Sequence, residues 1–318
     1  MNLAAGRFLI PTRLEGSPFF ARFQWVFDTV AARLGAEVMY CDDVRAEDLP
    51  PDCPFVVPFR PVQWSYSEGF GGLLTLPARI RVFGFWDNVH QGMKGTRWFH
   101  RDRRVLVRHF RRADAIITSN RTPFLKWYPR FADKLEHLPM FFTSSHFAGV
   151  EFNETPMPTC VLAGSLGKFY PFRQAVAGNP NVKVIPHPGY TEVQEGGGGG
   201  VFGADYAREL SRYVAAVTCG SVLGYAVAKY FELPAAGCLL LAQYLPDLDL
   251  LGYRDGVNYL AVTEKNFDAK LADVLARPEA YAPVRRAGFE LMRSRHADTH
   301  RAEQLEQFIR ARCAAGNG

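Results

Sequence analysis

The sequence lacks the features that would point to a membrane-spanning, secreted or zinc-binding protein. No apolar run approaches the roughly 20 residues that a membrane-spanning helix needs. The amino-terminal stretch has no basic leader followed by an uninterrupted apolar segment, so we expect no secretory signal. The six cysteines lie far apart, without a CxxC pair or a nearby histidine cluster. We therefore expect a reduced, cytoplasmic chain without structural zinc.

Strong charge of one sign is also absent overall, but the basic residues are unevenly distributed. The chain has 37 Lys and Arg against 32 Asp and Glu, a net charge of +5. Residues 101–112, RDRRVLVRHFRR, hold six arginines around an apolar stripe of Val105, Leu106 and Phe110. The pattern is typical of a solvated amphipathic helix; the alternative is a basic face that binds an acidic glycan or the anionic inner face of a membrane. No recognition module accompanies the arginines, so nucleic acid is not an expected partner.

Apolar runs of strand length recur along the whole chain and alternate with segments of helical period. Near-continuous apolar strands between helices indicate parallel sheets that are covered on both faces. With 318 residues, the chain is long enough for two domains of ~150 residues each. We therefore predict an α/β protein with two doubly wound, Rossmann-like domains, joined by the proline-containing segment 141–159, which has no clear period.

The strands are expected at 7–11, 36–41, 54–59, 80–86, 114–119, 159–164, 182–186, 214–219, 237–242 and 257–262. Helical periodicity marks 18–34, 97–112, 204–212 and 266–276, and the tail after residue 277 resembles two successive helices.

A glycine-containing turn follows the first strand of the second half, in the stretch GSLGKFYPFR. In doubly wound sheets, ligands bind beyond the carboxyl ends of strands, where helix N-termini offer free backbone donors. Gly164, Ser165 and Gly167 would allow close backbone approach, and Lys168 and Arg173 would add cations. This combination suits a diphosphate. The alternative is an ordinary strand-to-helix loop with an exposed lysine and arginine.

A second candidate follows the strand at 214–219, where Ser221 is expected to cap a helix that starts near Val222. Lys229 and Glu232 are three residues apart and would share one face of that helix. The lysine could hold a phosphate, and the glutamate could accept the hydroxyls of a ribose. As an ordinary surface ion pair they would stabilise the protein by only a few tenths of a kcal/mol. Pro234 requires the helix to kink or end.

The stretch AKYFELPAAGCLLLA, the later LGYRDGVNYLAV and the arginine- and histidine-bearing tail resemble the carboxyl-terminal half of group 1 glycosyltransferases. The similarity extends to the subgroup labelled glycosyltransferase-like or spore-maturation-protein-like, and it covers roughly residues 159–312. The first half resembles the family only in its architecture.

This resemblance implies a GT-B fold, in which two Rossmann-like domains face a central cleft. Residues 1–150 would form an acceptor-side domain, residues 151–295 a nucleotide-sugar-binding domain, and residues 296–318 a helix that packs back on the first domain. The family usually retains the anomeric configuration and needs no metal. The expected co-substrate is a UDP- or GDP-linked sugar, and the acceptor a glycan, a lipid-linked molecule or a protein; no other cofactor is expected.

By the same resemblance, Glu232 takes the place of the glutamate that binds the ribose hydroxyls, and Lys229 and Arg173 take cationic places near the diphosphate. The sequence departs from the family at Gly224, where many members carry a glutamate eight residues before the ribose-binding one. A donor-sugar contact is therefore missing or supplied differently. Two alternatives stay open: a nucleotide-sugar epimerase of the same fold, and a non-catalytic nucleotide-sugar-binding assembly protein.

In the first half, FGFWDNVHQG places Asp87 and His90 after an apolar strand. His90 could position the acceptor hydroxyl or contact the donor sugar, with Asp87 orienting its imidazole or acting as a base. Equally, Asp87 could start a turn and His90 could be structural. In the second half, His187 of IPHPGY could border the nucleobase or only shape a loop. The D-x-D at 247–249 is expected in a surface loop rather than at a metal site.

Overall fold

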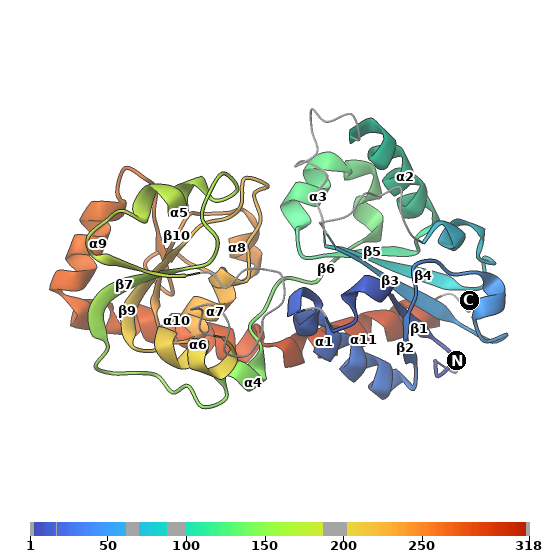
Figure 1. Ribbon diagram of the computed structural model, residues 1–318, viewed down its shortest axis with the longest axis horizontal. Helices are drawn as coiled ribbons and strands as arrows, with labels where there is room; N and C mark the ends of the chain where they lie inside the picture. Colours follow the sequence, from blue (N-terminus) through green and yellow to red (C-terminus); the bar gives the residue numbers. More distant parts are fainter. Residues whose placement is uncertain (1–2, 17, 62–69, 88–98, 187–201, 316–318) are drawn as a thin grey trace. The chain divides into compact units, whose positions relative to one another are not determined.

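The computed structural model of the chain describes residues 3–16, 18–61, 70–87, 99–186 and 202–315 (Figure 1). The chain forms two compact units. Unit 1 contains Met1–Pro139 and Thr299–Gly318, and unit 2 contains Met140–Asp298. The units therefore divide after residues 139 and 298, whereas the sequence pattern suggested divisions after 150 and 295. The first difference arises because three apolar residues after Pro139, namely Phe142, Phe147 and Val150, are buried in the core of unit 2.

Unit 1 contains a six-stranded, entirely parallel sheet with the order β2-β1-β3-β4-β5-β6. All five strands predicted in this half are present, and β6 is an additional short strand. The strands are β1 (Arg7–Ile10), β2 (Glu37–Tyr40), β3 (Phe55–Pro61), β4 (Arg81–Asp87), β5 (Ala115–Thr118) and β6 (Leu135–His137).

Helices cover both faces of this sheet, with α1 and α11 on one side and α2 and α3 on the other (Figure 1). Their bounds are α1 (Pro18–Leu34), α2 (Phe99–Arg112), α3 (Arg121–Trp127) and α11 (Asp298–Ala314). Short 3-10 turns occupy Thr12–Leu14, Ala46–Asp48, Gly71–Thr75 and Pro129–Lys134. The predictions of helices at 18–34 and 97–112 are confirmed over the described residues.

Aromatic side chains fill the space between α1 and the sheet of unit 1. Phe59 of β3 is fully buried, and its ring centroid lies 5.0–5.5 Å from those of four other phenylalanines. Three of these, Phe20, Phe23 and Phe27, recur at the spacing that places them on one face of α1. The burial of this face explains why the segment forms a long helix on the sheet.

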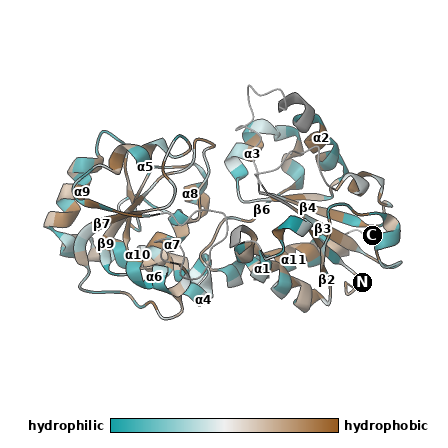
Figure 2. Cartoon of the chain, in the orientation of Figure 1, coloured by the Kyte–Doolittle hydropathy of each residue, from teal (hydrophilic) through white to brown (hydrophobic). Residues whose placement is uncertain are grey.

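Unit 2 contains a five-stranded parallel sheet with the order β11-β10-β9-β7-β8, and all five strands were expected from the sequence. Hydrophobic strands lie inside unit 2, and hydrophilic residues lie on its outer helices (Figure 2). The strands are β7 (Met157–Ala163), β8 (Val182–Ile185), β9 (Tyr213–Thr218), β10 (Leu239–Ala242) and β11 (Leu260–Ala261). The helices are α4 (Ser144–Phe147), α5 (Pro171–Val176), α6 (Gly203–Leu210), α7 (Lys229–Ala235), α8 (Asp247–Leu250), α9 (Phe267–Ala276) and α10 (Ala282–Arg295), with a 3-10 turn at Pro278–Tyr281.

Over the first five strands of each unit, the two sheets have the same order when each is counted from its own first strand: second, first, third, fourth, fifth. In such a doubly wound sheet, the connections leave in opposite directions on either side of the first strand. The resulting switch point lies between β1 and β3 in unit 1, and between β7 and β9 in unit 2. The carboxyl ends of these strand pairs are where a ligand site is expected.

The final helix α11 packs on unit 1. Arg301 Nε donates to the carbonyl of Pro139 at 2.9 Å, and Gln304 donates to the carbonyl of His137 at 2.9 Å. The chain just before α11 is held in unit 2, where Ala297 pairs with Phe142 in an isolated bridge. None of the helices in the described residues is long and apolar enough to cross a membrane.

Candidate functional site

The switch point of unit 2 begins with a turn that only glycine accommodates easily. β7 ends at Ala163, and Gly164 follows with φ +116°, in the region that favours glycine. A Cβ at Gly164 would lie 2.8 Å from Nη1 of Arg173 and 3.4 Å from Cε of Lys229. The turn therefore allows two cationic side chains from different helices to approach the same backbone position.

Arg173 lies in the first turn of α5 and is 2% exposed. Its Nε and Nη2 donate to Oγ1 of Thr218, at 3.2 and 2.8 Å, and its Nη1 donates to the carbonyl of Ser165 at 3.3 Å. The guanidinium carbon also lies 4.3 Å from the ring centroid of Tyr170. Within the described ranges, the guanidinium has no carboxylate partner. A buried positive charge held by neutral groups strengthens the attraction for an anion at this position.

Lys229 and Glu232 form an ion pair in the first turn of α7, with Nζ 2.6 Å from Oε2. Their side chains are 20% and 6% exposed, so the pair is not an ordinary surface ion pair. Lys229 Nζ also donates to the hydroxyl of Tyr206 at 2.7 Å and lies 4.4 Å from the centroid of that ring. The prediction that Lys229 and Glu232 share one helix face is confirmed.

The local structure around Ser221 differs from the prediction. The helix begins at Lys229 rather than near Val222, so Ser221 does not cap it. Instead, Ser221 Oγ accepts a hydrogen bond from the backbone of Leu223 at 3.1 Å, within a turn that leads to Gly224 with φ +77°. The short side chain thus stabilises the turn, because Ser offers its hydroxyl to the backbone two residues on.

Pro234 lies inside α7 and leaves the carbonyl of Tyr230 without its usual intrahelical donor. The hydroxyl of Tyr253 donates to that carbonyl instead. The helix then ends at Ala235, before Gly237 with φ +85°. This explains how α7 accommodates the proline and remains short.

The thiol of Cys219 follows β9 and lies near Arg173. Burial raises the pKa of Cys219, and the positive charge of Arg173 only partly opposes this shift. The thiol is therefore neutral at physiological pH, and it is unsuited to act as a thiolate nucleophile.

Five of the predicted donor-binding residues come together at the switch point: Gly164, Ser165, Arg173, Lys229 and Glu232. Lys168 is exposed, and its Nζ lies 5.6 Å from the ring centroid of Phe169. His90 and His187 lie outside the described residues. Asp87 is the last residue of β4, and only its backbone is described.

Three further residues contact the cations and were not expected from the sequence: Thr218, Tyr170 and Tyr206. Thr218 is the last residue of β9 and is fully buried. Thr218 could have been singled out from the sequence, because it is a polar residue at the end of an otherwise apolar strand. Tyr206 gave no comparable signal, because its contact with Lys229 joins two elements that are 23 positions apart. Tyr170 directly precedes α5, so its contact with Arg173 is local.

The D-x-D at 247–249 is helical rather than part of a loop. Asp247 opens α8 and is 3% exposed, and Asp249 accepts a hydrogen bond from Tyr244 at 2.8 Å. In the part of the chain that the structure describes, no three His, Cys, Asp or Glu residues are placed to hold a metal ion.

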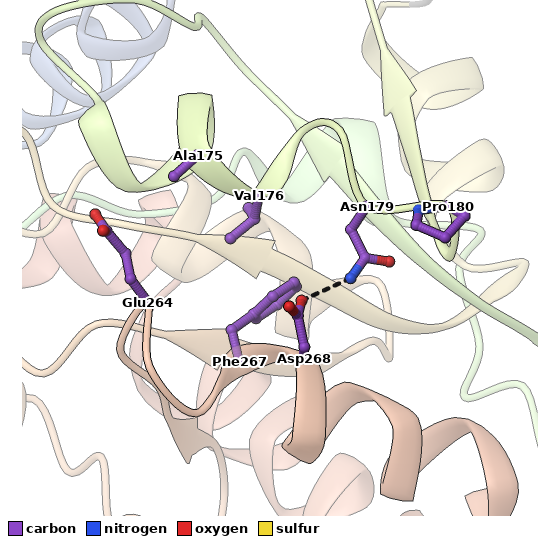
Figure 3. Close-up of a pocket in the computed structure, with 7 residues that line it drawn as sticks. All are labelled: Ala175, Val176, Asn179, Pro180, Glu264, Phe267 and Asp268. Carbon is purple, nitrogen blue, oxygen red and sulfur yellow. Dashed lines mark hydrogen bonds between the residues drawn. The ribbon is translucent and has the colours of Figure 1, made fainter.

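A separate hollow of about 240 Å³ lies on unit 2 beside the end of α5 and the start of α9 (Figure 3). Val176 and Phe267 face each other across it, and Asn179 donates to Asp268 at 2.7 Å (Figure 3). None of the five residues that come together at the switch point lines this hollow. Its lining consists of Ala175, Val176, Asn179, Pro180, Glu264, Phe267 and Asp268.

Comparison with known proteins gives one family match, over residues 163–307, to a family described as glycosyl transferase-like. No curated protein matches the sequence. The chain is similar in structure to HepE of Anabaena in complex with UDP-glucose, with a TM-score of 0.62 and 12% identity over 96% of this chain and 99% of that one. It is also similar to sucrose-phosphate synthase from Thermosynechococcus elongatus, with a TM-score of 0.64 and 13% identity over 98% and 99% of the two chains. The pneumococcal O-GlcNAc transferase GtfA, in complex with UDP and GlcNAc, has a TM-score of 0.52 and 13% identity over 81% of this chain and 56% of that one.

The structural similarities establish the fold: two Rossmann-like domains of the GT-B type. The family match covers the part of the chain that contains the five predicted residues at the switch point of unit 2. The predicted resemblance of this part of the chain to glycosyltransferases is therefore confirmed.

Proposed function

We propose that this GT-B chain, with its glycosyl transferase-like region at 163–307, moves a sugar from a nucleotide-sugar to an acceptor and binds the donor at the switch point of unit 2. The observation that carries the proposal is the convergence of Arg173 and Lys229 on Gly164, with Glu232 bonded to Lys229. HepE and GtfA, which have the same fold, are described in complex with UDP-glucose and with UDP. A UDP-linked sugar is accordingly the proposed donor, with a GDP-linked sugar as the alternative.

The geometry suits the chemistry of glycosyl transfer. Breaking the bond between sugar and phosphate leaves additional negative charge on the departing diphosphate. Fixed cations stabilise that charge without having to reorganise during the reaction. Arg173 is fixed by Thr218 and Ser165, and Lys229 by two contacts of its own. Stabilisation of the leaving diphosphate is therefore assigned to these two side chains.

Glu232 is assigned to the ribose. A carboxylate accepts hydrogen bonds from two neighbouring hydroxyls, and Glu232 lies one helical turn from the cation assigned to the diphosphate. In a nucleoside diphosphate, ribose and diphosphate are also adjacent. We further propose retention of the anomeric configuration and no requirement for a metal, with His90 and Asp87 on the acceptor side. Asp87 ends a strand at the carboxyl edge of the unit 1 sheet, as such a role requires.

A finer proposal concerns α2. Arg103, Arg104, Arg108 and Arg111 are exposed, whereas Leu106 and Phe110 are buried in unit 1. The apolar stripe is thus used for packing and is not available for insertion into a bilayer. We propose that the arginines hold the protein electrostatically at an anionic membrane surface, where a lipid-linked acceptor would be found.

The donor assignment is tested by replacing Glu232 with alanine and measuring UDP and GDP affinity by calorimetry. Loss of hydrogen bonds from ribose to a charged acceptor should weaken binding about 50-fold. Glu209→Ala is the matched control, because Glu209 also pairs with a lysine of unit 2, Lys183, at 2.9 Å. Unchanged affinity in the Glu232 variant would refute the assignment.

Turnover of UDP-, GDP- and dTDP-sugars, followed by product mass, separates the possible activities. Transfer to an added acceptor supports the proposal. A change of sugar configuration without an acceptor would indicate an epimerase. Tight binding of one nucleotide-sugar without turnover would indicate a non-catalytic binding protein.

A further inference from the structure

The two cations at the switch point are anchored in different ways. Arg173 has a planar guanidinium whose nitrogens bond neutral oxygens of Thr218 and Ser165. Lys229 has a compact ammonium on a flexible stem with four rotatable bonds, and such a group is not positioned by its own geometry. Its position depends on the groups around it. Two of these are Glu232, at 2.6 Å, and the hydroxyl of Tyr206, at 2.7 Å.

Tyr206 contacts the ammonium in two ways. Its hydroxyl accepts a hydrogen bond from Nζ, and Nζ lies 4.4 Å from the centroid of its ring. A cation over an aromatic face is attracted by the negative charge of the ring face, without being neutralised by a formal charge. The contact with Glu232 is different, because it joins two opposite charges.

With Tyr206 removed, the ammonium would lose one of these two contacts and could rotate about the Glu232 carboxylate, which it already contacts at 2.6 Å. The ammonium would then no longer be held in one position from which it can meet a ligand. Tyr206 lies in the first half of α6, a different element from the helix that carries Lys229 and Glu232. It therefore holds the ammonium from a second element, while Glu232 holds it from α7.

We propose that Tyr206 is a positioning residue that keeps the Lys229 ammonium directed at the diphosphate of the donor. This inference rests on the proposed donor site. Tyr206 acts through Lys229, and its effect should fall on the terminal phosphate more than on the rest of the nucleotide. A tyrosine that only packs against the core, as its partly buried ring also does, would not discriminate between UDP and UMP.

The test compares the affinities of UDP and UMP for the full chain, measured by calorimetry. Tyr206→Phe keeps the ring and removes the hydroxyl, so UDP should bind about five-fold more weakly, because a hydrogen bond to a charged group is lost. Tyr206→Leu also removes the ring and should weaken UDP binding about 20-fold. UMP affinity should change less than two-fold in both variants.

Tyr213→Phe is the matched control. Tyr213 also bonds a lysine of unit 2, Lys183, whose Nζ lies 5.0 Å from the ring centroid. Removing that hydroxyl deletes the same kind of contact outside the site, and the UDP to UMP ratio should stay as in the wild type. Equal losses for UDP and UMP, or no loss in either Tyr206 variant, would overturn the inference while leaving the donor site intact.

A second readout does not depend on a nucleotide. The labelling rate of Lys229 by an amine-directed reagent, followed by mass spectrometry, should rise in Tyr206→Leu because the ammonium is less firmly held. An unchanged rate would overturn the inference by itself. Failure of the wild type to bind any nucleoside diphosphate would instead refute the proposed function, and with it the role of Lys229 toward a diphosphate.

Discussion

The two units share one strand order but place their charged side chains differently. At the switch point of unit 2, Arg173 and Glu232 are almost completely buried. In unit 1, the space between α1 and the sheet is filled with phenylalanine rings, and the arginines at 103, 104, 108 and 111 of α2 are exposed. Residues 99–134 carry ten Lys and Arg against three Asp, a net charge of +7, whereas the remainder of the chain has 27 against 29 and a net charge of −2.

This difference teaches that topology fixes where a ligand can bind but not what binds there. A doubly wound sheet offers a crevice at its switch point in either unit. In the proposed donor site, the buried Arg173 and the partly buried Lys229 would favour an anion at the switch point of unit 2. The exposed arginines of α2 give unit 1 a surface that attracts anions without selecting one of them. Four variants test this contrast, in decreasing order of expected effect.

The largest effect is expected for Phe59→Ala in unit 1. Phe59 is fully buried among four other rings, so removing its ring should lower the free energy of unfolding by about 3–5 kcal/mol. Chemical denaturation measures this loss. At low temperature, UDP affinity should be unchanged in the folded fraction. A loss of affinity would show that the core of unit 1 also shapes the donor site.

Arg173→Lys tests the buried charge of unit 2. Lysine keeps the charge but lacks the planar fork that bonds Thr218 and Ser165, so its ammonium would not be fixed in the same place. UDP affinity should fall about 100-fold, which is measurable by calorimetry. Arg208→Lys on α6, an exposed position, is the matched control and should have no effect. Equal affinities in the two variants would contradict the assigned role of Arg173.

The exposed arginines of α2 are tested with the double variant Arg104→Gln and Arg108→Gln, one helical turn apart. Each arginine near an anionic surface contributes about 1 kcal/mol, so binding to phosphatidylglycerol vesicles should fall about 30-fold. Cosedimentation measures it, with phosphatidylcholine vesicles as the uncharged comparison. The same charge change at Arg208 and Arg212 of unit 2 should have little effect. Comparable losses from both units would indicate attraction to the net charge alone.

The smallest effect is expected for an exposed ion pair of unit 2. Hydrogen bonds from Tyr281 and Arg277 hold the pKa of Asp273 below its ordinary value. The folded state thus favours the carboxylate, and the resulting stability is present above the ordinary aspartate pKa and lost as pH falls through the lowered value. Asp273→Asn should therefore be slightly less stable than the wild type at pH ~7 and equal to it at pH ~2. Urea denaturation measures both stabilities. If the variant and the wild type differed more in stability at pH ~2 than at pH ~7, the assigned direction of the pH dependence would be wrong.

The strands and long helices could be predicted because their signals are local. Near-continuous apolar runs marked the ten predicted strands, and the 3.6-residue period marked α1, α2 and α9. Short elements escaped prediction because they contain too few residues for a period: β6 has three residues and α8 has four. The same limit explains the error at Ser221, where a polar residue after a strand resembles a helix cap but forms a turn.

Part of the candidate site was also readable from the sequence. Spacing placed Lys229 and Glu232 on one face of a helix, and the two glycines at 164 and 167 predicted a tight turn. The contacts of Arg173 with Thr218 and of Lys229 with Tyr206 could not be predicted, since these residues lie on different elements, 45 and 23 positions apart.

By itself, the amino-acid sequence determined the class of fold, the doubly wound strand content and the residue types available for binding a diphosphate, because these depend on periodicity and local spacing. Only the tertiary structure decided that Arg173 is buried against Thr218 and that Lys229 lies between Glu232 and a tyrosine. The physical reason is that the parallel order of the strands brings the ends of β7 and β9 together, and with them side chains that are remote along the chain.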